Sequence, residues 1–281
     1  MPKKMTRAAL ALAGLLVVSC AGGCSVARFR QQDELPDTSN QVNQQPQESQ
    51  PVTLEQEDLV YEKQLTLPSG AVAATYRAEL PQLAESGSKA PTIKKINQYY
   101  ESELATLKED CDSYFSQVQA SYGESWQTAQ QATAIYHVEY TYEPLELTDQ
   151  RVSLLRTYRY QDINQQEKVI YIGDTFDVGT GWPVKLEELF QGEQSEVEQT
   201  LNELVESWCE TNQVERSWLP QVTLEQQEND FALGENTLYL CLAETGVRTD
   251  SPGSYLVEIP LEELQDLLAQ DIWQPDEEDN G

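Results

Sequence analysis

The chain has 281 residues, enough for one or two domains with a hydrophobic core, and 48 acidic against 18 basic residues give it a net charge of −30. A surface of that charge repels a phosphate backbone, which argues against a protein that binds nucleic acid. The same charge steers cationic partners toward the protein, although acidity also serves solubility alone. At the level of composition, a solubility role and a partner-specific role both stay open.

The N-terminus has the pattern of a bacterial export signal. Three of the first seven residues are basic, residues 8–18 are 11 apolar or small residues, and small residues follow as far as Cys24. A bilayer takes about 20 apolar residues to cross, so this run is too short. Extended to Ala27, the segment approaches a marginal spanning length, and an uncleaved anchor is the alternative.

Two cysteines decide how this signal ends. Residues 17–20 read Val-Val-Ser-Cys and resemble a lipobox, in which the signal is cut off just before a cysteine that becomes lipidated. Residues 21–24, Ala-Gly-Gly-Cys, fit the pattern less well. We predict a lipoprotein signal peptide over residues 1–19 and lipidation of Cys20, with Cys24 as the alternative. The alternative interpretation is an ordinary signal peptide in which the two cysteines occur by chance.

Cleavage before Cys20 removes three of the basic residues and no acid, so the mature chain carries a net charge of −33. The segment that follows is rich in Gln, Asn, Ser, Pro and Glu, and it cannot bury enough apolar surface to offset the entropy of ordering. We assign residues 20–57 to a disordered tether, whose roughly 30 flexible residues span on the order of 30 Å. Residues 272–281 form an acidic tail without the spacing of an EF-hand.

Two strands and a long helix open the folded region. Residues 61–67 and 71–80 have strand-like patterns, and Pro-Ser-Gly at 68–70 suits a tight turn between them. Thr92 is the predicted N-cap of the helix. The apolar residues of this helix recur at steps of three and four and form one stripe: Ile93, Ile96, Tyr100, Leu104, Leu107, Cys111, Phe115 and Val118.

Three more strands are predicted at residues 134–142, 152–160 and 168–178. The first of them places its aromatic residues on one face, which favours core packing over stacking on sugars. The single histidine, His137, falls on the opposite, more polar face. A solvated or hydrogen-bonded structural role is therefore favoured for His137 over catalysis.

The stretch Gly179-Thr180-Gly181 follows the last of these strands and invites comparison with a phosphate-binding loop. Such a loop needs a third glycine and a helix that opens directly on the turn, but Trp182 and Pro183 stand there instead. We interpret the stretch as a hairpin or bulged turn with positive φ at its glycines. Trp182 either anchors a partner or folds back over the sheet edge.

The second half contains another helix and more strands. Ser195 and Glu198 match a capping box at the start of a helix that reaches about residue 210. Residues 231–243 and 255–259 are predicted strands, and residues 261–268 a last short helix. Helices and strands occur in runs with hairpin turns, without regular βαβ alternation, so we predict an α+β fold with antiparallel sheets packed by two main helices.

The sequence contains no catalytic constellation that we recognise. One histidine cannot build a two-histidine zinc site, and no G-x-S-x-G motif is present. Acidic residues are too numerous to single out a pair for glycoside hydrolysis. We expect no metal, no cofactor, no nucleotide and no enzymatic activity. An envelope enzyme that acts on cell-wall glycan through unrecognised carboxylates is the alternative.

Three cysteines lie beyond the signal: Cys111, Cys209 and Cys241. An odd count does not suggest a disulfide framework, and each lies in an apolar periodic run, so we expect buried free thiols. One disulfide among the three stays open.

Several short motifs resemble a bacterial extracytoplasmic family. TYRAELPQL at residues 75–83 and INQYY at 96–100 are similar to the DUF4163-like domain that precedes the catalytic domain of a PdaC-type peptidoglycan deacetylase. FDVGTG at 176–181, LEELF at 186–190 and GSYLVEIP at 253–260 are similar to DUF3298, a domain also found in RsiV-type anti-sigma factors. The resemblance divides the folded region into a PdaC-type half, residues 58–147, and a DUF3298-like half, residues 148–271.

The resemblance implies a non-catalytic binding or sensing module, lipid-anchored on the outer face of the bacterial cytoplasmic membrane. RsiV-type relatives recognise lysozyme, so a cationic envelope protein or peptide is the implied ligand, with Thr180 and Trp182 as candidate contacts. Only seven residues precede the apolar run, so we expect no sigma factor to be held. No deacetylase domain is present, and residues 162–167 stand where relatives carry a Gly-Gly-Ala-His element.

Overall fold

The computed structural model describes residues 51–162, 164–225, 230–245, 251–269 and 272. The predicted signal peptide, both lipidation candidates, most of the tether and most of the acidic tail lie outside these residues. The described end of the tether packs on the fold, because Val52 is buried and Leu54 forms an isolated bridge with Leu83. The folded region therefore begins by Val52, earlier than the sequence predicts.

In the part of the chain that the structure describes, nine strands form two sheets. The larger sheet has the order β1-β2-β3-β4-β5-β6, with bounds Leu59–Thr66, Val72–Leu80, Tyr136–Leu147, Arg151–Gln161, Glu167–Asp177 and Trp182–Pro183. The smaller sheet has the order β7-β8-β9, with bounds Phe231–Leu233, Thr237–Ala243 and Ser254–Pro260. The α-helices within the described residues are α2, Ala90–Tyr122, and α3, Gln194–Asn212. The 3-10 helices η1 to η5 are Gly87–Lys89, Gly123–Gln127, Leu186–Leu189, Arg216–Trp218 and Leu261–Leu264.

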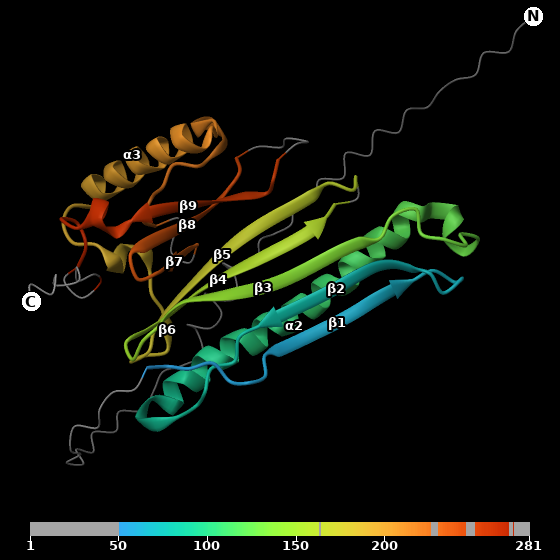
Figure 1. Cartoon of the computed structure of the whole chain (residues 1–281), viewed down its shortest axis with the longest axis horizontal. Coiled ribbons are helices and arrows are strands. Elements are labelled where there is room, and N and C mark those ends of the chain that lie inside the picture. Colours follow the sequence, from blue (N-terminus) through green and yellow to red (C-terminus); the bar gives the residue numbers. More distant parts are fainter. Residues whose placement is uncertain (1–50, 163, 226–229, 246–250, 270–271, 273–281) are drawn as a thin grey trace, which may run out of the picture.

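These elements make four layers (Figure 1). Helix α2 lies along one face of the six-stranded sheet, and their buried side chains form one hydrophobic cluster. The three-stranded sheet packs against β5 on the far side of the larger sheet, and α3 covers it and closes a second cluster. The mixture of helices and sheets agrees with the predicted α+β class. Within the described part of the chain, no helix combines the length and apolar character that crossing a bilayer requires.

One strand pair departs from the predicted antiparallel sheets. Strands β2 and β3 run parallel, from Ala74 opposite Tyr136 to Ala78 opposite Tyr140. The reason is that α2 lies between them in the chain and carries it back to the same end of the sheet, as in a βαβ crossover. The other strand pairs of the described sheets are antiparallel, so the six-stranded sheet is mixed.

The apolar stripe of α2 is confirmed, since all eight of its residues are buried against the sheet. The predicted N-cap is wrong, because the helix begins at Ala90 and Thr92 lies within its first turn. Pro91 explains the earlier start, since its fixed φ and missing N–H suit the first turn of a helix. The Thr92 hydroxyl instead donates a hydrogen bond of 2.8 Å to the carbonyl oxygen of Lys89.

The predicted capping box of the second helix is also wrong. Helix α3 begins at Gln194 with Glu193 as N-cap, and no side chain caps it, so Ser195 lies inside the helix. The Glu198 carboxylate accepts hydrogen bonds from the Gln194 side chain (2.8 Å) and from the Leu224 backbone N–H (3.0 Å). These two donors lower the pKa of Glu198 from its ordinary value, and they bind the helix to the following loop.

The predicted strand over residues 231–243 is two strands. The chain turns between β7 and β8, where the Gly234 N–H donates to the carbonyl oxygen of Thr237 over 2.8 Å. The residues between the strands are Gly234, Glu235 and Asn236, a polar stretch typical of a turn, so the sequence carried a signal that the prediction passed over. The three described cysteines, Cys111, Cys209 and Cys241, are buried and free, as the sequence predicts.

The two sheets meet closely at β5. A side chain at Gly173 would place its Cβ 2.0 Å from the carbonyl carbon of Phe231 in β7, so only glycine fits there. Beside it, the Ser153 hydroxyl accepts a hydrogen bond of 2.7 Å from the Leu233 backbone N–H. Strand β5 therefore faces α2 with one set of alternate residues and the smaller sheet with the other.

Candidate functional site

The turn between β5 and β6 is held by its own backbone and by one carboxylate. The Asp177 side chain accepts a hydrogen bond of 2.7 Å from the Thr180 N–H, and its carbonyl oxygen accepts one of 2.7 Å from the Gly181 N–H. Gly181 has a φ of 72°, and a Cβ there would lie 2.7 Å from the Thr92 carbonyl oxygen. Gly179 does not share the positive φ that the sequence suggests. The turn thus rests against the first turn of α2.

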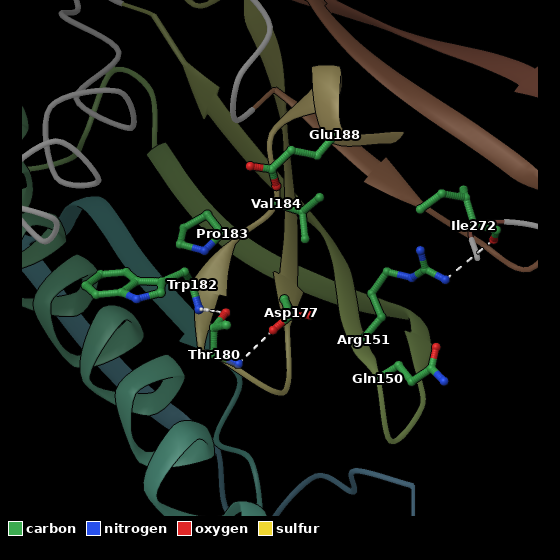
Figure 2. Close-up of a pocket in the computed structure, with 9 residues that line it drawn as sticks. All are labelled: Gln150, Arg151, Asp177, Thr180, Trp182, Pro183, Val184, Glu188 and Ile272. Carbon is green, nitrogen blue, oxygen red and sulfur yellow. Dashed lines mark hydrogen bonds between the residues drawn. The ribbon is translucent and has the colours of Figure 1, made fainter. Parts of the chain in front are cut away.

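Trp182 and Thr180 are both in place beside this helix. The Lys95 ammonium lies 4.9 Å from the centroid of the Trp182 ring and also reaches the Thr180 carbonyl oxygen at 3.5 Å. Trp182 is half-buried, and Figure 2 shows its indole beside α2. The indole therefore lies against α2, whereas Thr180 is exposed at the tip of the turn.

A hollow of about 620 Å³ opens at this end of the sheet (Figure 2). We call it the strand-end hollow, and its lining residues are Gln150, Arg151, Asp177, Thr180, Trp182, Pro183, Val184, Glu188 and Ile272. They come from the start of β4, the end of β5, the following turn, β6 and the residue after it, η3, and the last described residue. Its volume lies within the range of small-molecule sites.

The hollow carries charges of both signs. The Arg151 guanidinium forms an ion pair of 3.1 Å with Glu146, and both side chains are largely buried. Asp177 and Glu188 supply two carboxylates, and each uses one oxygen to accept a backbone N–H, from Thr180 and from Lys185 (3.2 Å) respectively. These bonds orient both carboxylates in a wall that also contains the apolar side chains of Pro183 and Val184.

Backbone hydrogen bonds hold the end of the described chain against this site. The Ala269 N–H donates to the Leu189 carbonyl oxygen (2.9 Å), and the Gln191 N–H donates to the Leu267 carbonyl oxygen (2.8 Å). Beyond them, Ile272 completes the wall, and its carbonyl oxygen lies 3.5 Å from an Nη of Arg151. The hollow is therefore formed by segments far apart in the sequence, since Arg151 and Ile272 are separated by 121 positions.

A cluster of buried charges lies behind the site, between α2 and the sheet. The Arg156 guanidinium in β4 binds Asp174 in β5, with an Nε–Oδ2 distance of 2.6 Å, and Glu103 in α2 at 3.1 Å. The Tyr99 and Tyr100 hydroxyls donate to the two oxygens of Asp174 at 3.3 and 3.2 Å. We call these five residues the Arg156 cluster.

Burial sets the protonation of this cluster. Burial raises the pKa of Tyr99 and Tyr100 well above the ordinary value, so both hydroxyls keep the proton that they donate. Burial also raises the pKa of Asp174, and the charge of Arg156 opposes that rise. Arg156 is 2% exposed and Asp174 7%, so the cluster is closed to a polymeric substrate.

Sequence reasoning missed this cluster, although a signal was present. Asp174 occupies the alternate position between Ile172 and Phe176 on the face of β5 that turns toward α2, and Arg156 interrupts the corresponding face of β4. A charge at the core position of an amphipathic strand indicates a buried partner, since burying an unpaired charge is unfavourable in free energy.

His137 is half-buried on the outer face of β3. Among the described residues, no group of three or more His, Cys, Asp or Glu side chains could hold a metal ion.

Comparison with known proteins gives similarity in structure only. No family model matches the chain, and no curated protein is similar to it in sequence. A DUF3298-family protein from Bacteroides fragilis superposes with a TM-score of 0.54 at 12% identity, covering 78% of this chain and 95% of its own. One from Pseudomonas aeruginosa PAO1 gives a TM-score of 0.48 at 11% identity, covering 80% and 96%. The first similarity shows that the chain shares the fold of a DUF3298-family structure.

The Arg156 cluster predicts a large and specific loss of stability. Arg156→Met leaves Asp174 and Glu103 buried without their cation, which should lower the free energy of unfolding by about 3–5 kcal/mol. Arg159→Met is the matched control, because Arg159 lies on the same strand, is 46% exposed and pairs with Glu167 only at 3.8 Å. It should cost about 0–1 kcal/mol. Urea denaturation measures both, and equal effects would contradict a structural role for the cluster.

Proposed function

We propose that the protein is an exported lipoprotein, anchored on the outer face of the bacterial cytoplasmic membrane, whose folded part binds a cationic envelope protein or peptide without catalysing a reaction. The export pattern and the lipobox-like cysteines support the location. The observation that carries the binding role is the pair of oriented carboxylates, Asp177 and Glu188, at one hollow of a chain whose net charge is −30.

The hollow suits a lysine or arginine side chain of a partner. Such a side chain has an apolar stem and a charged head, so the stem can lie on Pro183 and Val184 while the head meets the two carboxylates. Because one oxygen of each carboxylate is already fixed by a backbone N–H, little side-chain entropy is lost when the other binds. The overall charge adds steering of the encounter.

The Arg156 cluster supports a non-catalytic role. Asp174 and Glu103 are the most enclosed described carboxylates near the site, and both are engaged by Arg156 in a closed core.

A glycan-acting enzyme is the second candidate. Asp177 and Glu188 line the same hollow as Trp182. Glycoside hydrolases use a pair of carboxylates for catalysis, and aromatic rings stack on sugars. Incubation with cell-wall fragments distinguishes the two, since turnover that a single Asp177 or Glu188 substitution abolishes would favour the enzyme.

The location has its own test. Mass spectrometry of the membrane fraction should find diacylglycerol on Cys20, or on Cys24, of a chain that begins at that residue. Cys20→Ser should then release the protein or move the modification to Cys24. A mature chain that begins at another residue and is found in the soluble fraction would contradict the anchor.

Binding is tested by calorimetry against lysozyme, a cationic protein, with the chain from Ser25 onward, which keeps every described residue. Asp177→Asn/Glu188→Gln should weaken binding about tenfold or more, because a charge-assisted contact is lost while the backbone N–H bonds are kept. Glu206→Gln/Glu210→Gln, on the exposed face of α3, makes the same charge change and should leave affinity unchanged. Trp182→Ala should weaken binding because the indole supports the wall.

Salt separates a specific site from diffuse attraction. Exposed charges are screened over about 8 Å at physiological ionic strength, so attraction by net charge alone fades there. Binding at the hollow should persist. Loss of all binding at physiological salt, or equal weakening by both double substitutions, would contradict a specific site. The negative net charge would then serve only to keep the protein soluble.

A further inference from the structure

We propose that the strand-end hollow recognises a carboxylate beside a cationic group, with Arg151 receiving the carboxylate and Asp177 and Glu188 receiving the cation. The inference rests on the proposed function, since it concerns the same site, and it narrows the ligand to a chemistry that carries both charges. A peptide that ends in a basic residue has this chemistry, and so does a free zwitterionic amino acid.

The first observation is that Arg151 and Asp177 face each other without pairing. They are direct partners in the β4–β5 register, so their Cβ atoms lie on one face of the sheet, about 4.5–5.5 Å apart. Arg151 nevertheless forms its ion pair with Glu146, and Asp177 binds the Thr180 N–H. No ion pair joins the two among the described residues. Opposite charges thus line the hollow side by side, each held in place by another partner.

The second observation is the state of the guanidinium. Its Nε donates to Glu146 at 3.1 Å, while one Nη reaches the Ile272 carbonyl oxygen only at 3.5 Å, a long contact for a hydrogen bond. Arginine has five N–H donors in a planar fork, and the two Nη groups can hold a carboxylate through parallel bonds. Figure 2 shows the guanidinium between Asp177 and Ile272.

The third observation is burial. The Arg151 side chain is 13% exposed, so its charge is only partly screened by water. For a ligand with cationic groups alone, this charge opposes part of the attraction that Asp177 and Glu188 exert, so such a ligand binds more weakly. A ligand that also brings a carboxylate removes that repulsion and gains charge-assisted bonds. Arg151 therefore acts as the specificity-determining group of the site.

The first test varies the chemistry of the ligand and keeps the protein unchanged. Calorimetry of the chain from Ser25 onward compares a lysine-rich peptide that ends in Lys with a free carboxylate, the same peptide with a C-terminal amide, and free lysine. The acid should bind about tenfold tighter than the amide, as expected for a charge-assisted hydrogen-bonded pair. Free lysine that binds as well as the acid would identify the amino-acid source, and binding by the peptide acid alone would identify a peptide C-terminus.

Variants then assign the preference to Arg151. Glu146→Gln/Arg151→Gln removes the guanidinium without leaving Glu146 unpaired, and it should abolish the preference for the acid while binding of the amide is kept or improved. Arg159→Gln, the matched control on the same strand, should keep the preference. Arg151→Lys should keep part of it, because the charge stays and the fork is lost.

The outcomes also separate this inference from the proposed function. Equal affinity for acid and amide would overturn the inference, and the proposed function would stand if Asp177→Asn/Glu188→Gln still weakened both peptides. A preference for the acid that survives Glu146→Gln/Arg151→Gln would also overturn it. If neither peptide binds, both proposals fall.

Discussion

The buried guanidinium of Arg156 is the interaction on which the rest of the structure depends. It joins three elements, because Arg156 belongs to β4, Asp174 to β5 and Glu103 to the middle of α2. Burying a charge is costly unless partners with good geometry surround it, and the two tyrosine hydroxyls complete the set. Apolar side chains would pack α2 on the sheet in many ways, whereas this cluster selects one orientation.

That orientation reaches the candidate site through the helix. The first two turns of α2 carry Thr92 and Lys95, which contact the turn at Gly181 and the ring of Trp182. Strand β5 provides the second route: it binds the cluster at Asp174, touches the smaller sheet at Gly173 and ends at Asp177 in the hollow. A displacement of α2 or of the smaller sheet would therefore move the wall of the hollow.

The sequence predicts well what depends on local periodicity. The eight residues of the apolar stripe of α2, the positions of the main strands and the buried free cysteines follow from spacing and composition. The parallel pairing of β2 and β3 does not, because neither strand carries a mark of its partner. The start of α2 was missed because Pro91 outweighs Thr92. The break before β8 was missed although the polar residues Gly234, Glu235 and Asn236 mark it in the sequence.

The candidate site shows the same division. The turn and its residues Thr180 and Trp182 were visible as a sequence feature, but Arg151 and Glu188 join them only through strand register and chain folding. The Arg156 cluster was hidden for a different reason. Its charged residues occupy positions of the strands and the helix where the periodic pattern expects apolar residues. A search for periodic apolar residues does not select them.

The central claim is that a cationic partner binds at the end of the six-stranded sheet and not diffusely over the acidic surface. Nuclear magnetic resonance of the isotope-labelled chain, titrated with lysozyme at physiological salt, tests it most directly. The account predicts that the backbone amide signals of Arg151, Thr180 and Glu188 shift together and saturate. Shifts confined to the exposed acidic face of α3, around Glu206 and Glu210, and rising without saturation would contradict it.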